Sequence, residues 1–215
     1  MPQGPSVKAP KNSLTYFDVF HDCDHTAGLA VSGGGTFTYD GIAGHPGVFG
    51  MTTSTSQWNQ VKLNWGSTAS VKPFNIDNFE RVTWVFKIDS VVDVATWFGL
   101  YGGTGVSNDQ NQTGSIVSYI SNTALSFHVN SAGTSNVTTS VTVAANTWYK
   151  FDIVRNSATS VSLWVNDVLA ATITTGVPSG SICGIGGRLM TATTSAKSWY
   201  VDSIHPRFVT PTSRY

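Results

Sequence analysis

The chain has 215 residues, equal numbers of basic and acidic residues, and only 11% charged residues. Ser and Thr together number 52 and Gly 21, whereas Glu80 is the one glutamate. Few helix-favouring charges and many β-branched residues predict an all-β protein. The balanced charge argues against nucleic-acid binding through a basic face, and the chain has no apolar run long enough to span a membrane.

The length suits one β-sandwich domain, because sandwiches of about 200–250 residues are common as single domains. Proline and glycine in the first residues, at Pro2, Gly4, Pro5 and Pro10, predict an extended arm over 1–13. We expect the sandwich over 14–208 and a tail over 209–215. The N-terminal segment lacks the apolar stretch of a secretory signal peptide.

Strand patterns follow one another along the chain, with turn residues between them. The clearest is 79–89, where Val82, Trp84, Phe86 and Ile88 fall on one face. No ten-residue stretch has a helical period, so we expect almost no helix beyond one turn. The predicted strands are 36–39, 58–65, 79–89, 96–101, 115–120, 124–130, 135–143, 147–155, 160–165, 170–174, 181–185 and 197–204.

Alternation within these strands predicts which side chains fill the core. A tight hairpin is expected at Asn166-Asp167, because both residues tolerate a positive φ. The predicted core is Phe37, Leu63, Val82, Trp84, Phe86, Ile88, Phe98, Leu100, Leu125, Phe127, Trp148, Phe151, Ile153, Leu163, Val165, Val201 and Ile204.

Two glycine-rich segments, 99–105 and 184–187, do not open helices, so they are not phosphate-binding loops. We interpret these glycines as serving turns, bulges or close strand approach.

The cluster 21–25 contains His21, Cys23 and His25, which would share one face of a strand. These three side chains could hold zinc if a fourth ligand came from elsewhere, although we expect Cys23 in the core and no metal or other cofactor. We expect Cys23 and Cys183 to be two buried thiols, and a disulfide between them is the alternative.

Four aromatic side chains lie on the polar faces of their predicted strands. Trp97 and Tyr101 lie opposite Phe98 and Leu100, and His128 and Trp164 are placed in the same way in later strands. Aromatic rings stack on sugar C–H surfaces. Trp97, Tyr101, His128 and Trp164 are therefore candidates for a glycan-binding platform, and a second layer of packing is the alternative role.

The order of motifs resembles the concanavalin A-like (laminin G-like) jelly-roll superfamily over residues 15–208. In that family a W-y-x-φ-x-φ strand, here beginning at Trp148, precedes a strand ending in an Asn-Asp turn, here Asn166-Asp167, and a final strand carries D-x-I, here Asp202-Ser-Ile204. The stretch His45-Pro-Gly-Val48 resembles a motif of jelly-roll domains in bacteriophage virion proteins.

This resemblance implies an antiparallel β-sandwich of the jelly-roll type and a virion structural protein. The expected roles are capsid decoration, head fibre or part of a tail fibre, on the virion surface after assembly in the host cytoplasm. The expected partners are other capsid or tail proteins and further copies of the chain, but neither nucleic acid nor membrane. The sequence does not define the oligomer, and a trimer is one candidate for a fibre or a capsid three-fold site. The alternative is a lectin-like module that recognises host surface glycans.

We do not expect a glycoside hydrolase or another enzyme. Hydrolases of this superfamily carry a Glu-x-Asp-x-x-Glu strand, whereas Glu80 is followed at those spacings by Val82 and Val85. Such chemistry needs two facing carboxyl groups about 5–9.5 Å apart. A pair of Asp side chains meeting across a groove would reopen this possibility.

Overall fold

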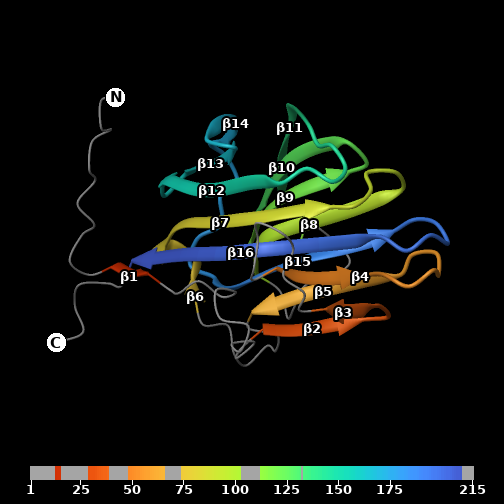
Figure 1. The fold of residues 1–215 in the computed structure, drawn as a ribbon. Helices are drawn as coiled ribbons and strands as arrows, with labels where there is room; N and C mark the ends of the chain where they lie inside the picture. Colours follow the sequence, from red (N-terminus) through yellow and green to blue (C-terminus); the bar gives the residue numbers. More distant parts are fainter. Residues whose placement is uncertain are drawn as a thin grey trace, which may run out of the picture.

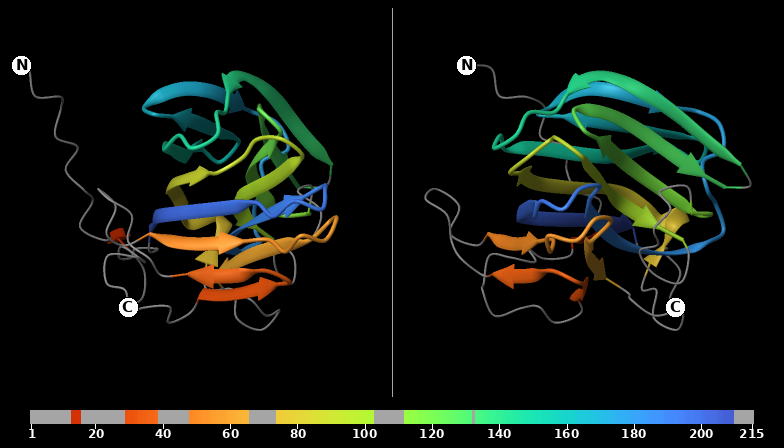
Figure 2. Two further views of the ribbon diagram at one scale, coloured as in Figure 1. Left: turned by 45° about the vertical axis from the view of Figure 1, so that its right-hand side comes forward. Right: turned by 90° about the vertical axis from the view of Figure 1, so that its right-hand side faces the viewer.

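The protein, in a computed structural model, is an antiparallel β-sandwich, as the sequence predicts. The structure describes residues 13–15, 29–38, 48–65, 74–102, 112–131 and 133–209. Two sheets lie face to face, and Figures 1 and 2 show both layers. Within the described ranges the helical structure is one 3₁₀ turn, η1 (Ile76–Asn78), and no helix is long and apolar enough to cross a membrane.

Sheet A runs in the order β14-β13-β12-β7-β16-β4-β3, with β1 also paired to β16. Because β1 and β16 are the first and last described strands, the two ends of the sandwich chain lie side by side. The strands of sheet A are β1 (Ser13–Thr15), β3 (Thr36–Thr38), β4 (Phe49–Thr52), β7 (Phe79–Ile88), β12 (Tyr149–Ser157), β13 (Ser160–Val165), β14 (Val168–Ile173) and β16 (Ser198–Val209).

Sheet B runs in the order β11-β10-β9-β8-β15-β5-β2, with β6 also paired to β15. The predicted turn between β13 and β14 is confirmed, since Asn166 and Asp167 have φ of 49° and 66°. The strands of sheet B are β2 (Leu29–Gly33), β5 (Gln60–Trp65), β6 (Phe74–Asn75), β8 (Val94–Tyr101), β9 (Ser115–Ser121), β10 (Ala124–Asn130), β11 (Thr134–Thr142) and β15 (Ile182–Thr191).

The core lies between the sheets and is rich in aromatic rings. Trp84 stacks on Trp199 with ring centroids 5.9 Å apart, and Phe86 stacks on Phe151 at 5.0 Å. These rings come from neighbouring strands of sheet A, and Phe98 of sheet B packs on Trp84 at 5.6 Å. The burial of such rings contributes most of the driving force for folding.

The predicted core is confirmed with two corrections. Phe37 is only partly buried at the core edge, and Trp148 lies outside the core. Trp148 precedes β12 and is in phase with the outward residues Lys150 and Asp152, so Tyr149 takes the place against the core. Asn146, with φ of 55°, turns the chain just before this point.

Several predicted strands differ in extent from the observed ones, and β16, predicted over 197–204, continues to Val209. Residue 58 was expected in a strand, but β5 begins at Gln60 and Trp58 adopts a φ of 62° in the preceding turn. The segment 184–187 lies inside β15, which continues to Thr191 because β8 and β5 pair with it on both sides.

Candidate functional site

The four predicted platform residues do not share one surface. Trp97 and Tyr101 of β8 and His128 of β10 lie on the outer face of sheet B, whereas Trp164 of β13 lies on the outer face of sheet A. Trp97 and Tyr101 are 1% and 0% exposed, and they pack with Val117 into a small cluster separate from the core. Their rings are packing elements in this structure, which matches the alternative role for them.

His128 is also largely enclosed. Its Nε2 lies 2.7 Å from Ser126 Oγ, and the Tyr119 ring meets the imidazole edge-on at 5.7 Å between centroids. Burial lowers the pKa of His128 below its ordinary value, because a low-dielectric environment disfavours the charged imidazolium.

This lowered pKa predicts an acid-sensitive contribution to stability. The unfolded chain protonates His128 near pH 6.5, while the folded protein resists protonation, so acid favours the unfolded state. The free energy of unfolding should therefore fall as the pH drops below about 6.5. Urea titrations from pH 8 to pH 5 should show a steeper fall for the wild type than for His128→Gln, and parallel curves would contradict the prediction.

The metal cluster predicted at His21, Cys23 and His25 lies outside the described residues. Within the described part of the chain, no three His, Cys, Asp or Glu side chains are grouped to hold a metal ion. Cys183 is fully buried at the start of β15, as expected of a buried thiol, and Cys23 lies outside the described residues.

Glu80 forms an ion pair between two interior strands of sheet A, near the start of β7 and the end of β16. Its Oε2 lies 2.6 Å from Nε of Arg207, across the β7–β16 pair, and both side chains are about one-third exposed. An acid held by a guanidinium in this way is a structural partner, and the absence of hydrolase activity stays a prediction.

A buried carboxylate forms the centre of the outer face of sheet A. Asp152 is 3% exposed although it points away from the core, because its neighbours Phe151 and Ile153 take the inward positions of β12. Thr83 Oγ1 donates a hydrogen bond to Asp152 Oδ1 from the adjacent β7. Burial of a carboxylate requires such partners.

Two cations and one indole surround this carboxylate. Nζ of Lys150 lies 3.5 Å from Asp152 Oδ2, and Nε of Arg81 lies 3.8 Å from Oδ1. Lys150 also donates to Asp167 at 2.6 Å, and this hydrogen bond raises the pKa of Lys150. Trp164 is the direct cross-strand neighbour of Asp152 and is half-buried. Directly opposed residues on one face have Cβ atoms about 5 Å apart.

A second group lies further along the same face. Nζ of Lys87 lies 5.4 Å from the ring centroid of Trp148 and 5.0 Å from that of Tyr200, so the ammonium sits between two half-buried rings. Tyr200 pairs with Gly50 of β4, and a Cβ placed on Gly50 would be 3.5 Å from Tyr200 Cδ1. That distance is an ordinary van der Waals contact, whereas the same Cβ would come within 2.5 Å of Thr38 Oγ1, so the glycine makes room for the Thr38 hydroxyl.

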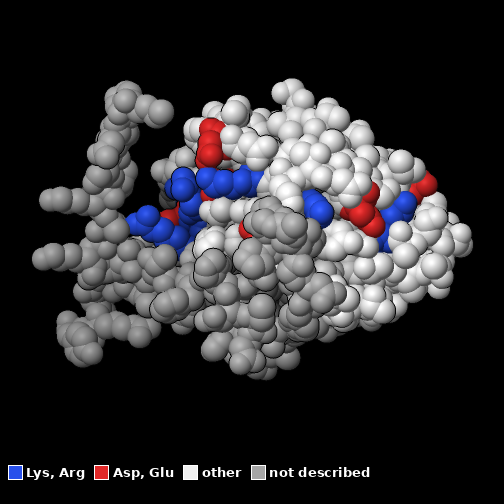
Figure 3. Space-filling view, viewed as in Figure 1, with Lys and Arg blue, Asp and Glu red and all other residues white. Residues whose placement is uncertain are grey.

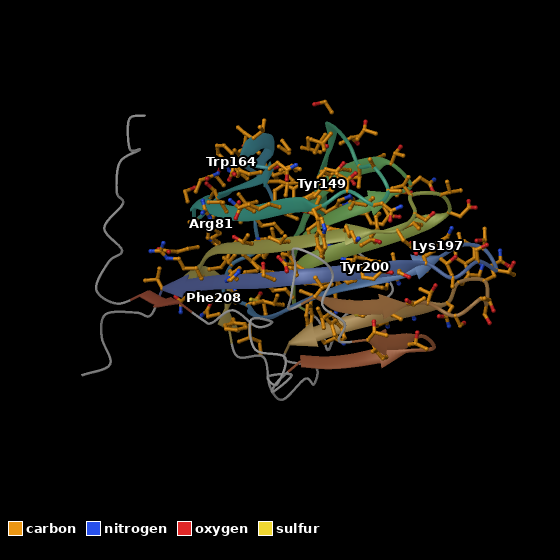
Figure 4. The ribbon with its side chains drawn as sticks, viewed as in Figure 1. Arg81, Tyr149, Trp164, Lys197, Tyr200 and Phe208 are labelled. Carbon is orange, nitrogen blue, oxygen red and sulfur yellow. The ribbon has the colours of Figure 1, made fainter. Side chains whose placement is uncertain are left out.

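We call this surface the aromatic–charged face. Figure 3 shows its charged side chains as a band across the side of the molecule seen in Figure 1, and Figure 4 labels Trp164, Arg81 and Tyr200 on it. It combines rings that can stack on apolar C–H surfaces with donors and a carboxylate that can hydrogen-bond to hydroxyl groups. Its members are Arg81, Thr83, Lys87, Trp148, Lys150, Asp152, Trp164 and Tyr200.

Sequence reasoning identified Trp164 but did not assign Trp148 and Tyr200 to this face. For both residues, the alternation of inward and outward side chains along the strand indicated an outward position. Tyr200 lies between the inward residues Trp199 and Val201, and Trp148 is in phase with the outward residues of β12.

Comparisons with known proteins support the lectin-like fold. The protein of unknown function SO2946 from Shewanella oneidensis MR-1 aligns over 99% of each chain with a TM-score of 0.63 and 16% identity. The carbohydrate recognition domain of Emp47p aligns over 97% of this chain and 100% of its own, with a TM-score of 0.63 and 11% identity.

The binding domain of botulinum neurotoxin DC in complex with SialylT aligns over 93% of this chain and 48% of its own. Its TM-score is 0.60 and its identity 13%, so this chain spans about half of that structure. A comparison with curated protein sequences found no match. The model of the family described as "SO2946-like, C-terminal domain" matches residues 44–202, most of the chain. The chain therefore belongs to the SO2946-like, C-terminal domain family.

Proposed function

We propose that this chain is a carbohydrate-binding domain and that the aromatic–charged face is its saccharide surface. The observation that carries the proposal is the half-buried Trp164 directly beside the buried carboxylate of Asp152. A sugar ring offers an apolar C–H face and a rim of hydroxyl groups, and this pair provides a partner for each. The likeness in fold to the Emp47p carbohydrate recognition domain supports the same function.

The geometry of the face also favours an extended ligand. Trp164 of β13 pairs with Asp152, and Trp148, just before β12, is four residues from Asp152, which places the two indoles about 13 Å apart along the strand direction. Trp148 and Tyr200 flank Lys87 from the two adjacent strands. Rings spaced in this way suit two or three linked sugar units. The exposed cation Arg81 and the half-buried cation Lys87 favour saccharides that carry acidic groups.

Glycan-array binding tests the proposal. Trp164→Ala should weaken binding about tenfold or more, because a stacked aromatic contributes about 0.5–1.5 kcal/mol beyond the area it buries. Asp152→Asn, which keeps an acceptor for Thr83, should weaken it as well. Val168→Ala is the matched control, since Val168 is 67% exposed on the neighbouring β14.

The array also defines the result that contradicts the proposal. If the wild-type protein binds no glycan, the proposed carbohydrate-binding function is wrong. If Trp164→Ala and Asp152→Asn both bind glycans as well as the wild type does, the saccharide surface is not the aromatic–charged face. Circular dichroism of each variant shows whether the fold is retained.

The virion role predicted from the sequence remains a hypothesis alongside this proposal. A capsid decoration, head-fibre or tail-fibre protein that binds host glycans would have both the virion role and the carbohydrate-binding function. Light scattering of the purified chain tests the candidate trimer, and a protein that is monomeric and has no affinity for capsid or tail proteins would contradict the virion role.

A further inference from the structure

An exposed tryptophan lies at one end of the sandwich, away from the aromatic–charged face. Trp58 is in the connection between β4 and β5, which Figure 1 shows at the right-hand end together with the β7–β8 and β15–β16 connections. Its side chain is 60% exposed. In the described residues the other large exposed hydrophobic side chains are all aliphatic.

Trp58 also has a backbone conformation that is unfavourable for a bulky residue. Its φ of 62° lies in the left-handed region, which residues with a Cβ adopt at a cost. Exposure brings no packing gain that would offset this cost. A glycine or asparagine would meet the same turn geometry more easily. Such outliers persist where the surrounding structure enforces them, and they are concentrated at functional sites.

The surrounding structure enforces this conformation through a set of hydrogen bonds. The amide of Trp58 donates to the carbonyl of Thr191 at 2.9 Å, and the amide of Thr191 donates to the carbonyl of Asn59 at 3.0 Å. The Asn59 side-chain oxygen accepts from the amide of Ser54 at 2.8 Å. The amide of Ala192 donates to the backbone carbonyl of Asp93, in the β7–β8 connection, at 2.8 Å. The indole is therefore presented by a rigid set of three connections.

The chemistry around the indole is uncharged. Residues 52–59 and 191–196 contain only hydroxyl, amide and apolar side chains besides Trp58 itself. The nearest cation in sequence, Lys62, is half-buried in β5 and is paired across the sheet with Arg188. Lys197, which follows 191–196, is 8% exposed and donates to Ser90. The acids of the neighbouring β7–β8 connection are Asp89, which accepts from the amide of Ser198, and Asp93. An exposed indole in a ring of hydroxyl and amide groups suits the C–H face and hydroxyl rim of a neutral sugar.

We infer that Trp58 is the stacking residue of a second saccharide subsite, specific for an uncharged sugar ring. This inference rests on the proposed carbohydrate-binding function and deepens it, because the two subsites take chemically different sugars. The aromatic–charged face takes acidic units, and the end of the sandwich takes neutral ones. A glycan bearing both kinds of unit can engage the protein at two places.

The test combines a binding and a stability measurement on Trp58→Gly. Binding of neutral oligosaccharides on the array should fall at least tenfold, while binding of acidic glycans is retained. The melting temperature should stay the same or rise, because glycine adopts the left-handed region freely. Trp58→Phe should keep most of the neutral binding. Val92→Ser is the matched control, since Val92 is 63% exposed in the adjacent connection.

Three outcomes overturn the inference, and they are distinguishable. A wild-type protein that binds no glycan removes the proposed function and this subsite with it. Neutral binding that is unchanged in Trp58→Gly but lost in Trp164→Ala removes the second subsite alone. Sedimentation with phosphatidylcholine vesicles that depends on Trp58, without any neutral-sugar binding, assigns the indole to a lipid surface instead.

Discussion

Replacing Phe86 by alanine should lower the free energy of unfolding by about 3–5 kcal/mol. Phe86 is fully buried and contacts three other rings, with centroids 4.7 Å from Phe98, 5.0 Å from Phe151 and 5.6 Å from Trp199. Phe98 belongs to the opposite sheet, so the cavity would open between the two layers. Rings held from both sheets cannot collapse fully into that space, which puts the expected cost at the upper end.

Urea denaturation followed by tryptophan fluorescence measures this loss. The control is Val168→Ala, which removes an exposed side chain from β14 and should change stability by less than about 0.5 kcal/mol. A loss below about 1 kcal/mol for Phe86→Ala would contradict the packing described for the core.

The inward face of β7 illustrates what the sequence could predict. Val82, Trp84, Phe86 and Ile88 occupy every second position of the strand, and all four are buried as expected. The period of two depends only on local backbone geometry, so one strand's residues are enough to assign its two faces. The same rule, extended one step before β12, would have placed Trp148 on the outside.

The candidate site was harder to predict, because alternation does not reveal which sheet a strand joins. Trp97 and Trp164 both lie on outward faces, yet long-range pairing places β8 in sheet B and β13 in sheet A. Alternation also does not reveal burial on an outward face. Trp97 is 1% exposed there, whereas Trp164 is half-buried and accessible.

The role of glycines in strands was left open by the sequence. The glycines of 184–187 were interpreted as serving a turn, a bulge or close strand approach, and they lie inside β15 between two partner strands. A Cβ on Gly187 would come within 2.5 Å of the Trp199 ring, so its hydrogen makes room for a core indole. Close approach was among the expected uses of these glycines, and only the tertiary contact distinguishes it from a turn.

The same reasoning gives the second large effect, at Gly99 of β8. Its φ is 144°, a region that residues with a Cβ rarely adopt. A Cβ there would lie 2.4 Å from the carbonyl oxygen of Ile116 on β9 and 3.0 Å from Ile153 Cδ1 of sheet A. Gly99→Ala should therefore cost about 2–6 kcal/mol, because backbone strain and overpacking each contribute about 1–3 kcal/mol.

Gly133→Ala is the control for this prediction, since a Cβ at Gly133 would have nothing within 4 Å and the position has no strained φ. Both variants add the same methyl group, so the difference between their denaturation midpoints measures the destabilisation caused by the surroundings of residue 99. The clashing atom at β9 is backbone, which can move only if the β8–β9 pairing shifts. A Gly99→Ala protein as stable as Gly133→Ala would mean that β8 and β9 separate easily at this point. A large loss would show that Gly99 is required for the close approach of β8 and β9.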